Sequence, residues 1–559
     1  MSIIHARRLR LASALVVAAV AAWGLMGHGE AKDDPPANGG IPVVPLRPSV
    51  QDAGRCNVCH TFGTPPESTD LQPLCRCNER TFWEQNDKHQ DAYVLLGGER
   101  AKRINKLRGS DVAPEKDQDC LGCHSMVSVN LLAKTKIDDK VIAKGVSCLA
   151  CHGPWNNWID VHGTSDEETR KAWRKLDRTY KQEKFGMTDL WDPVKRTKVC
   201  ASCHIGDADP DKHRLVTHDM YAGGHPPLPA FETAVFCNSL PRHWQLMNEK
   251  AREMQKAQYQ WDPTELEQTK LVVAGGAAAF REAVNLLAQK AEQADKDKQV
   301  LDFALFDCAA CHHDLHQPSW RQERGYNGAP GRPGPRSWSA AVMDLCNWQA
   351  AGMDKERDQK FAADLKNGVA SLYQSFGRRP FGDNAEVKKT AQALVALMDD
   401  ELLPKLNAPM KTDGAHESAF SKKAARELLK RLANSAAKPA AGATPDYDAA
   451  RRTAWAFEAI YDDLRRAAED SKDAEDMRLK ENQAAIVAQL AKLDASLNLK
   501  LPNAGEGVAD EEYKKDPDKV KEHRRAEIED FLPQVLKATA EYTPEEFHKT
   551  FEEIVKLLP

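Results

Sequence analysis

The sequence predicts a mainly α-helical protein in two parts, a cysteine- and histidine-rich region at residues 51–345 and a helical, bundle-like region at residues 346–559. Two observations support this fold class. The pattern Cys-x-x-Cys-His occurs five times before residue 313 and is not repeated after it. Beyond residue 346, and also at 264–299, apolar residues recur at helical spacing with little β-strand signal. The helices expected in the second part are 355–376, 385–405, 447–470, 474–497 and 518–536.

Each pentapeptide has the pattern of an attachment site for c-type haem. Two thiols three positions apart lie on one side of a helical turn, where each can form a thioether with a haem vinyl group. The histidine that follows supplies an imidazole to the iron from one face. A zinc site or a redox dithiol would not require this histidine in every copy. We therefore expect five haems c, attached through Cys56, Cys59, Cys120, Cys123, Cys148, Cys151, Cys200, Cys203, Cys308 and Cys311, and ligated by His60, His124, His152, His204 and His312.

The motifs are closely spaced, with about 50 residues of chain for each haem, which is too little to bury the haems separately. The haems must therefore pack against one another and form much of the core of residues 51–345. Each iron also has a second axial position, for which methionine (Met126, Met220) is an alternative to histidine. Eight further histidines are available, and the first four are the leading candidates: His89, His162, His218, His225, His213, His243, His313 and His316.

Local patterns around these histidines predict their secondary structure. An aromatic and aliphatic face from Phe82 to Leu96 predicts a helix that includes His89. His218 and His225 are seven residues apart, but the Gly-Gly pair before His225 and the proline after it predict a loop at the second histidine.

Four cysteines lie outside the motifs: Cys75, Cys77, Cys237 and Cys346. Their even number permits two disulfides in an exported protein, with partners that the sequence does not fix. A bridge between Cys75 and Cys77 would be strained. A catalytic thiol is the other interpretation.

The N-terminal segment has the pattern of a secretory signal. A basic stretch precedes an apolar run at residues 11–26, and Gly29-Glu30-Ala31 suits cleavage after residue 31; an uncleaved membrane anchor at 11–26 is the alternative. Residues 32–50 are rich in proline and glycine, as expected of a linker. A periplasmic or otherwise exported location also suits c-type haem attachment. The formal net charge of −5, without a basic stripe, argues against nucleic acid as a partner.

The haem-motif region resembles the multihaem cytochromes of the cytochrome c-554 type over residues 51–235. The resemblance rests on the close second and third motifs, on Cys151-His152-Gly153-Pro154 followed by His162, and on the stretch from Thr217-His218 to Gly224-His225-Pro226. It implies a mainly helical fold with stacked haems, and a five-coordinate haem for which His124 is the candidate site. A fifth motif, the Cys75/Cys77 segment and the long C-terminal region depart from the family. The distal ligands that the resemblance implies are His89, His162, His218 and His225.

The pattern favours an electron carrier that exchanges electrons with redox partner proteins, and it predicts no catalytic residue. The alternative is an oxidoreductase that acts on a small nitrogen or sulfur compound at one five-coordinate haem. The C-terminal helices could also provide a docking surface for a partner.

Overall fold

The computed structural model describes residues 53–61, 77–125, 139–153, 158–244, 264–319, 322, 331–352, 358–407, 418–439, 444–502 and 514–559. The expected signal segment 1–31, the linker 32–50, Cys75 and Met126 lie outside these ranges. The described part of the chain contains helices and no β-strand, which confirms the predicted mainly α fold class.

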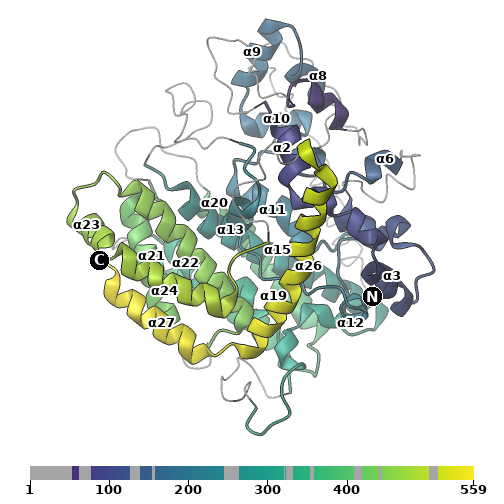
Figure 1. Ribbon diagram of the computed structural model, residues 1–559. Helices are drawn as coiled ribbons and strands as arrows, with labels where there is room; N and C mark the ends of the chain where they lie inside the picture. Colours follow the sequence, from purple (N-terminus) through teal and green to yellow (C-terminus); the bar gives the residue numbers. More distant parts are fainter. Residues whose placement is uncertain are drawn as a thin grey trace, which may run out of the picture.

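Short helices make up the described part of the chain that carries the first four motifs (Figure 1). Aspartate side chains accept hydrogen bonds from the first backbone N–H groups of several of them, including Asp117, Asp177 and Asp192. These helices are α2 (Glu79–Asn86), α3 (Glu99–Leu107), α4 (Gln118–His124), α6 (Asp139–Ile142), α7 (Cys148–His152), α8 (Ile159–His162), α9 (Glu167–Lys175), α10 (Arg178–Phe185), α11 (Pro193–His204), α12 (His218–Gly223) and α13 (Thr233–Ser239).

The prediction of a single helix from Phe82 to Leu96 is wrong. Helix α2 ends at Asn86, and two 3-10 turns follow, η2 (Lys88–Asp91) and η3 (Val94–Gly97). Asp87 causes the break, because its extended backbone ends α2 while its side chain accepts the His89 N–H and starts η2. His89 therefore lies in a turn of its own.

Helix α15 (Glu267–Asp297) is the centre of the core, and it confirms the helix predicted at 264–299. It packs against α11, α13, α17 (Met343–Ala350), α19 (Asn384–Leu397) and α22 (Tyr447–Ala467). Gly275 and Gly276 permit this close approach, since an added Cβ would lie 2.9 Å from Thr197 Oγ1 and 2.7 Å from Val342 Cγ2, respectively. Of the described helices, α15 alone has the length and apolar composition to cross a membrane, but 78% of its apolar window is buried inside the protein.

Each of the five segments predicted beyond residue 346 contains a helix within the described residues, which begin at 358 for the segment 355–376, and two of the segments are interrupted. The segment 474–497 is divided at Asn482, and 385–405 contains a π-helical turn at Met398–Leu402. Helices α21 and α27 were not predicted. The C-terminal helices are α18 (Gln359–Ser375), α20 (Leu403–Leu406), α21 (Lys422–Ala437), α23 (Ala474–Glu481), α24 (Gln483–Leu497), α26 (Pro517–Glu541) and α27 (Pro544–Leu557), besides α17, α19 and α22.

One hydrophobic core joins the two expected parts of the chain. It includes residues from Val194 to Leu558 and crosses the expected boundary between residues 345 and 346. Within it, Arg452 and Glu232 form a fully buried ion pair whose Nε–Oε2 distance is 3.6 Å. Helix α26, yellow in Figure 1, leaves the other C-terminal helices and lies against α2 and η2 beside the motif-bearing helices.

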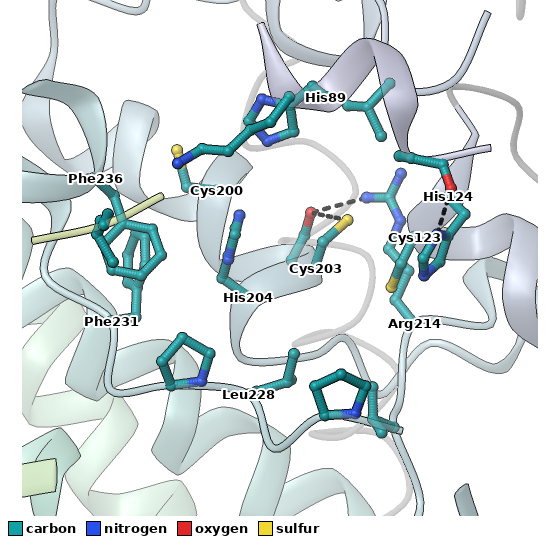
Figure 2. A pocket seen from close by; sticks show the side chains of 18 of the residues that line it. His89, Cys123, His124, Cys200, Cys203, His204, Arg214, Leu228, Phe231 and Phe236 are labelled. Atoms are coloured by element: carbon teal, nitrogen blue, oxygen red, sulfur yellow. Dashed lines mark hydrogen bonds between the residues drawn. The ribbon is translucent and has the colours of Figure 1, made fainter. Parts of the chain in front are cut away.

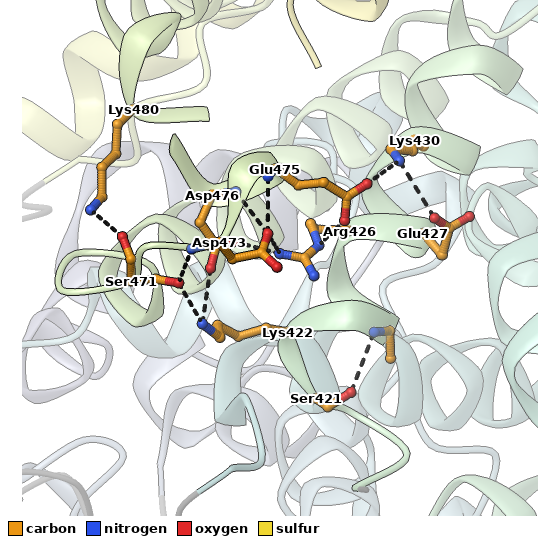
Figure 3. A network of polar contacts seen from close by, with 11 residues as sticks. Ser421, Lys422, Arg426, Glu427, Lys430, Ser471, Asp473, Glu475, Asp476 and Lys480 are labelled. Atoms are coloured by element: carbon orange, nitrogen blue, oxygen red, sulfur yellow. Dashed lines mark hydrogen bonds and ion pairs between the residues drawn. The ribbon is translucent and has the colours of Figure 1, made fainter. Parts of the chain in front are cut away.

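A charged network fastens α23 to α21 (Figure 3). Arg426 Nη1 donates to the buried carboxylate of Asp476 at 2.5 Å, and Arg426 Nε lies 3.0 Å from Glu475 Oε2. Lys422 Nζ approaches the second Asp476 oxygen at 2.9 Å. Because Asp476 is fully buried, it needs both cations as partners.

Candidate haem-binding site

A single cavity of about 2710 Å³ brings the five motifs together. A pocket for a drug-sized ligand has a volume of about 300–1,000 Å³, so this cavity is several times larger than one small-molecule site. All ten motif cysteines and all five motif histidines line it. So do His89, His162, His218, His225, His243 and His313.

Each motif lies on a helical turn, as the attachment chemistry requires. The second, third and fourth motifs lie in α4, α7 and α11, while the first and fifth lie at the 3-10 turns η1 (Ala53–Val58) and η9 (Cys308–Ala310). The backbone N–H groups of His60 and His312 each donate to the carbonyl of the first cysteine of their motif, at 2.9 and 2.8 Å. This turn places the two thiols and the imidazole on the same side.

Three motif histidines face a second imidazole across the cavity. The ring centroids are 6.1 Å apart for His60 and His162, with an angle of 7° between the ring planes. With a metal–imidazole nitrogen bond of about 2 Å, two rings on opposite sides of one metal have centroids roughly 6 Å apart. The His60 and His162 rings therefore have the spacing of two axial ligands.

The other two pairs have the same separation and different angles. His89 and His204 are 6.2 Å apart with nearly perpendicular planes, at 88°, and Figure 2 shows both rings with Cys200 and Cys203 around the same space. His218 and His312 are 6.3 Å apart, at 26°. In each pair, one histidine belongs to a motif and the other is a distal candidate from the sequence.

Hydrogen bonds at Nδ1 orient several of these rings. Nδ1 of His60 lies 2.7 Å from Glu79 Oε2, and Nδ1 of His89 lies 3.0 Å from Asp87 Oδ1. The His124 Nδ1–H donates to the Ala92 carbonyl at 2.7 Å. A partner at Nδ1 fixes the tautomer and leaves Nε2 as the metal-binding nitrogen.

Burial lowers the pKa of several of these imidazoles, which favours the neutral form that metal binding requires. It lowers the pKa of His162 and of His152 to about 4, and that of His204 to about 3. Apolar rings produce part of this environment, because Phe231 stacks on His204 at 5.6 Å. His89 differs, because its pKa is raised. Burial alone would lower this pKa, but the charge and the hydrogen bond of the adjacent Asp87 carboxylate outweigh the effect of burial.

The histidine of the second motif, His124, has a different relation to its distal candidate, His225. Burial lowers the pKa of His225 to about 4, and the charge of nearby His124 contributes to the shift. Among the described rings, however, His124 and His225 do not form a close imidazole pair like the three pairs that are 6.1 to 6.3 Å apart. His225 follows Gly224, whose φ of 108° ends α12, so the predicted loop at this position is confirmed.

His243, like His313, is a cavity histidine that the sequence did not place among the leading candidates. It lies near His152 of the third motif, where its charge contributes to the lowered pKa of that ring. More than 90 residues separate the two along the chain. In the sequence, His243 was only one of the eight further histidines of the haem-motif region, and no local pattern marked it as a ligand.

The remaining candidates lie elsewhere or have other contacts. His213 Nδ1 lies 2.6 Å from Asp119 Oδ1, and neither His213 nor His316 lines the cavity. Met220 is buried and lines the cavity wall. Cys237 and Cys346 are free thiols rather than a disulfide pair: Cys237 lies near Cys200, whereas Cys346 Sγ donates to the Val273 carbonyl.

A helical fold, Cys-x-x-Cys-His turns around one cavity, and paired imidazoles across it define a c-type cytochrome, whose haem c is covalently bound. Residues 55–153 match the family model for cytochrome c554 and c-prime, and this part of the chain is a cytochrome c554-type multihaem segment. The match includes the first three motifs and confirms that part of the resemblance expected over 51–235. No curated protein and no solved structure matches the chain.

Proposed function

We propose that this protein is an exported electron carrier with five haems c, one at each Cys-x-x-Cys-His motif. The observation that carries the proposal is the set of three imidazole pairs, 6.1 to 6.3 Å apart, on the wall of a cavity that contains all five motifs. When bound, haem iron accepts and releases one electron at a time. The chain's own residues bring the five motifs together around that cavity.

The ligand sets follow from the ring geometry. His60 with His162, His204 with His89, and His312 with His218 would hold the irons of the first, fourth and fifth haems. Two imidazoles without methionine favour a low reduction potential. His243 is the distal candidate for the third site, and His225 for the second.

The proximity of attachment cysteines from different motifs supports a spatial order for the sites. Cys56 of the first motif lies near Cys148 of the third, and Cys151 of the third lies near Cys203 of the fourth. Cys203 in turn lies near Cys123 of the second motif. The series 1–3–4–2 therefore differs from the order in the sequence.

Helix α12 extends the series to the fifth site. His218 begins the helix and faces the fifth motif, while His225 follows its end and lies near the second motif. The proposed path is thus 1–3–4–2–5. Cys59 at one end, and Cys308 and Cys311 at the other, are exposed, so redox partner proteins have access to both ends.

A specific observation favours a second candidate function. The second site lacks a close imidazole pair among the described rings, and an iron with an open position there would bind a small nitrogen or sulfur compound. His225 lies near this position, with its Nδ1 2.8 Å from the Pro226 carbonyl oxygen. The protein would then be an oxidoreductase whose other haems deliver electrons.

Two measurements on the exported protein test these proposals. Denaturing mass spectrometry should give the mass of the chain without residues 1–31 plus five haems, and a smaller number of haems in fully matured protein contradicts the proposal. Titration of the reduced protein with carbon monoxide then separates the functions. Little binding supports the carrier, whereas binding at one haem together with turnover of hydroxylamine, nitrite or nitric oxide supports the oxidoreductase.

A further inference from the structure

The turn that carries His89 has little structure of its own. It is the single 3-10 turn η2, which Asp87 caps by accepting the backbone N–H of His89 at 2.9 Å. One such turn forms few hydrogen bonds and is not stable without outside contacts. The position of the His89 ring therefore depends on what holds η2 in place.

An arginine from the far end of the chain holds it. Arg524 on α26 donates from Nε to Asp91 Oδ2 at 2.5 Å, from Nη1 to the Gln85 carbonyl at 2.5 Å, and from Nη2 to Gln90 Oε1 at 3.0 Å. Asp91 is fully buried and Arg524 is only 4% exposed. The planar guanidinium fixes the directions of all three bonds, which a lysine ammonium cannot do.

A second contact holds the other side of the same turn. Lys88 Nζ donates to the Pro502 carbonyl at 3.2 Å and to Ser239 Oγ at 3.4 Å. Residues both before and after His89 are thus bound to the C-terminal region. Helix α26 also contributes Phe531, Leu532 and Val535 to the cavity wall.

We propose that Arg524 is a positioning residue for the His89 imidazole. By holding Asp91, Gln90 and the end of α2, it sets the near-perpendicular angle at which His89 faces His204. The inference rests on the proposed function in one respect, the role of His89 as the distal ligand at the fourth site. The C-terminal helix is then part of the ligand system, more than 400 residues along the chain from the histidine that it positions.

The test compares Arg524→Gln with Arg525→Gln in the full-length holoprotein. Arg525 is the matched control, because it follows on the same helix, is 34% exposed and makes a longer contact of 3.3 Å with the same Asp91. Near-perpendicular axial imidazoles give a low-spin EPR signal with a larger principal g value than parallel ones. In Arg524→Gln we expect this signal to shift or weaken and carbon monoxide binding to rise by up to one haem per chain; in Arg525→Gln we expect neither change.

Two further variants separate the possible failures. Arg524→Lys keeps the charge beside Asp91 without the full set of directed bonds, so its EPR shift should be smaller than that of Arg524→Gln. If Arg524→Gln does not mature, Arg524→Lys decides, and an unchanged spectrum in it overturns the proposal. His89→Ala should abolish the signal. If the signal remains in His89→Ala, the assignment of His89 as a ligand is wrong. If the signal is lost in His89→Ala but the mature Arg524 variants have the wild-type spectrum, only the positioning role of Arg524 is wrong.

Discussion

Replacement of Gly122 by alanine should separate the second and fourth haem motifs. Gly122 lies between the two cysteines of the second motif, against the backbone of residues 212–213. An added Cβ would lie 2.5 Å from the Lys212 carbonyl oxygen and 2.7 Å from the His213 carbonyl carbon, and closer still to the His213 oxygen. Ordinary contacts begin at 3.4 Å, so this backbone would have to move by about 1 Å.

The backbone that meets the new methyl group cannot easily move. Arg214 donates from Nε to the Gly122 carbonyl and from Nη1 to Ser202 Oγ, both at 2.8 Å, and so ties the two motifs together. The His213 ring is also held by Asp119. Overpacking of a fitted interior costs about 1–3 kcal/mol, and we expect about 3 kcal/mol because the obstructing atoms are backbone.

Guanidinium unfolding of the holoprotein, followed by far-UV circular dichroism, measures this loss of unfolding free energy. The matched control is Ala150→Gly at the same place in the third motif, where a Cβ is already accommodated. Its expected cost is about 1 kcal/mol, from helix propensity alone. If Gly122→Ala costs no more than Ala150→Gly, the close packing of the second and fourth motifs inferred here is wrong.

Three further predictions concern single side chains. His162→Ala should convert one haem from low-spin to high-spin in the EPR spectrum, because it removes the ring that faces the first motif, while the exposed control His316→Ala should leave the spectrum unchanged. Burial raises the pKa of Glu232 to about 7, against about 4.3 in an unfolded chain, so the folded protein binds more protons between these values. The free energy of unfolding should therefore fall as pH rises from about 4 to about 7, and Glu232→Gln should remove this part of the pH dependence in denaturant titrations. Arg426→Ala leaves a buried carboxylate without its closest partner and should cost about 3–5 kcal/mol in urea unfolding, whereas Lys430→Ala, which removes exposed ion pairs, should cost at most about 1 kcal/mol. Equal costs for these two variants would contradict the account of the network.

The haem motifs and the longer helices could be predicted because their signals are local. A Cys-x-x-Cys-His turn is complete within five residues, and helix α15 shows its apolar spacing over its whole length. The break after α2 was missed because one residue, Asp87, changes the structure through its side-chain hydrogen bond. Helices α21 and α27 also carry apolar residues at helical spacing, for example Phe547, Phe551 and Ile554 in α27, so their signal was local as well and was missed.

The partner of each distal histidine could not be predicted from distance along the chain. His218 follows the fourth motif but faces His312 of the fifth, and His89 follows the first motif but faces His204 of the fourth. His243 was passed over because it lies far from the third motif in sequence. Folding brings these residues together through the shared core, which the sequence pattern divided into two parts.

A structure of the mature holoprotein, with the iron positions located by anomalous scattering, tests the central claim most directly. The account predicts five irons, three of them with two imidazole ligands: His60 with His162, His204 with His89, and His312 with His218. An iron at the first, fourth or fifth motif with a different sixth ligand, or with none, would contradict it.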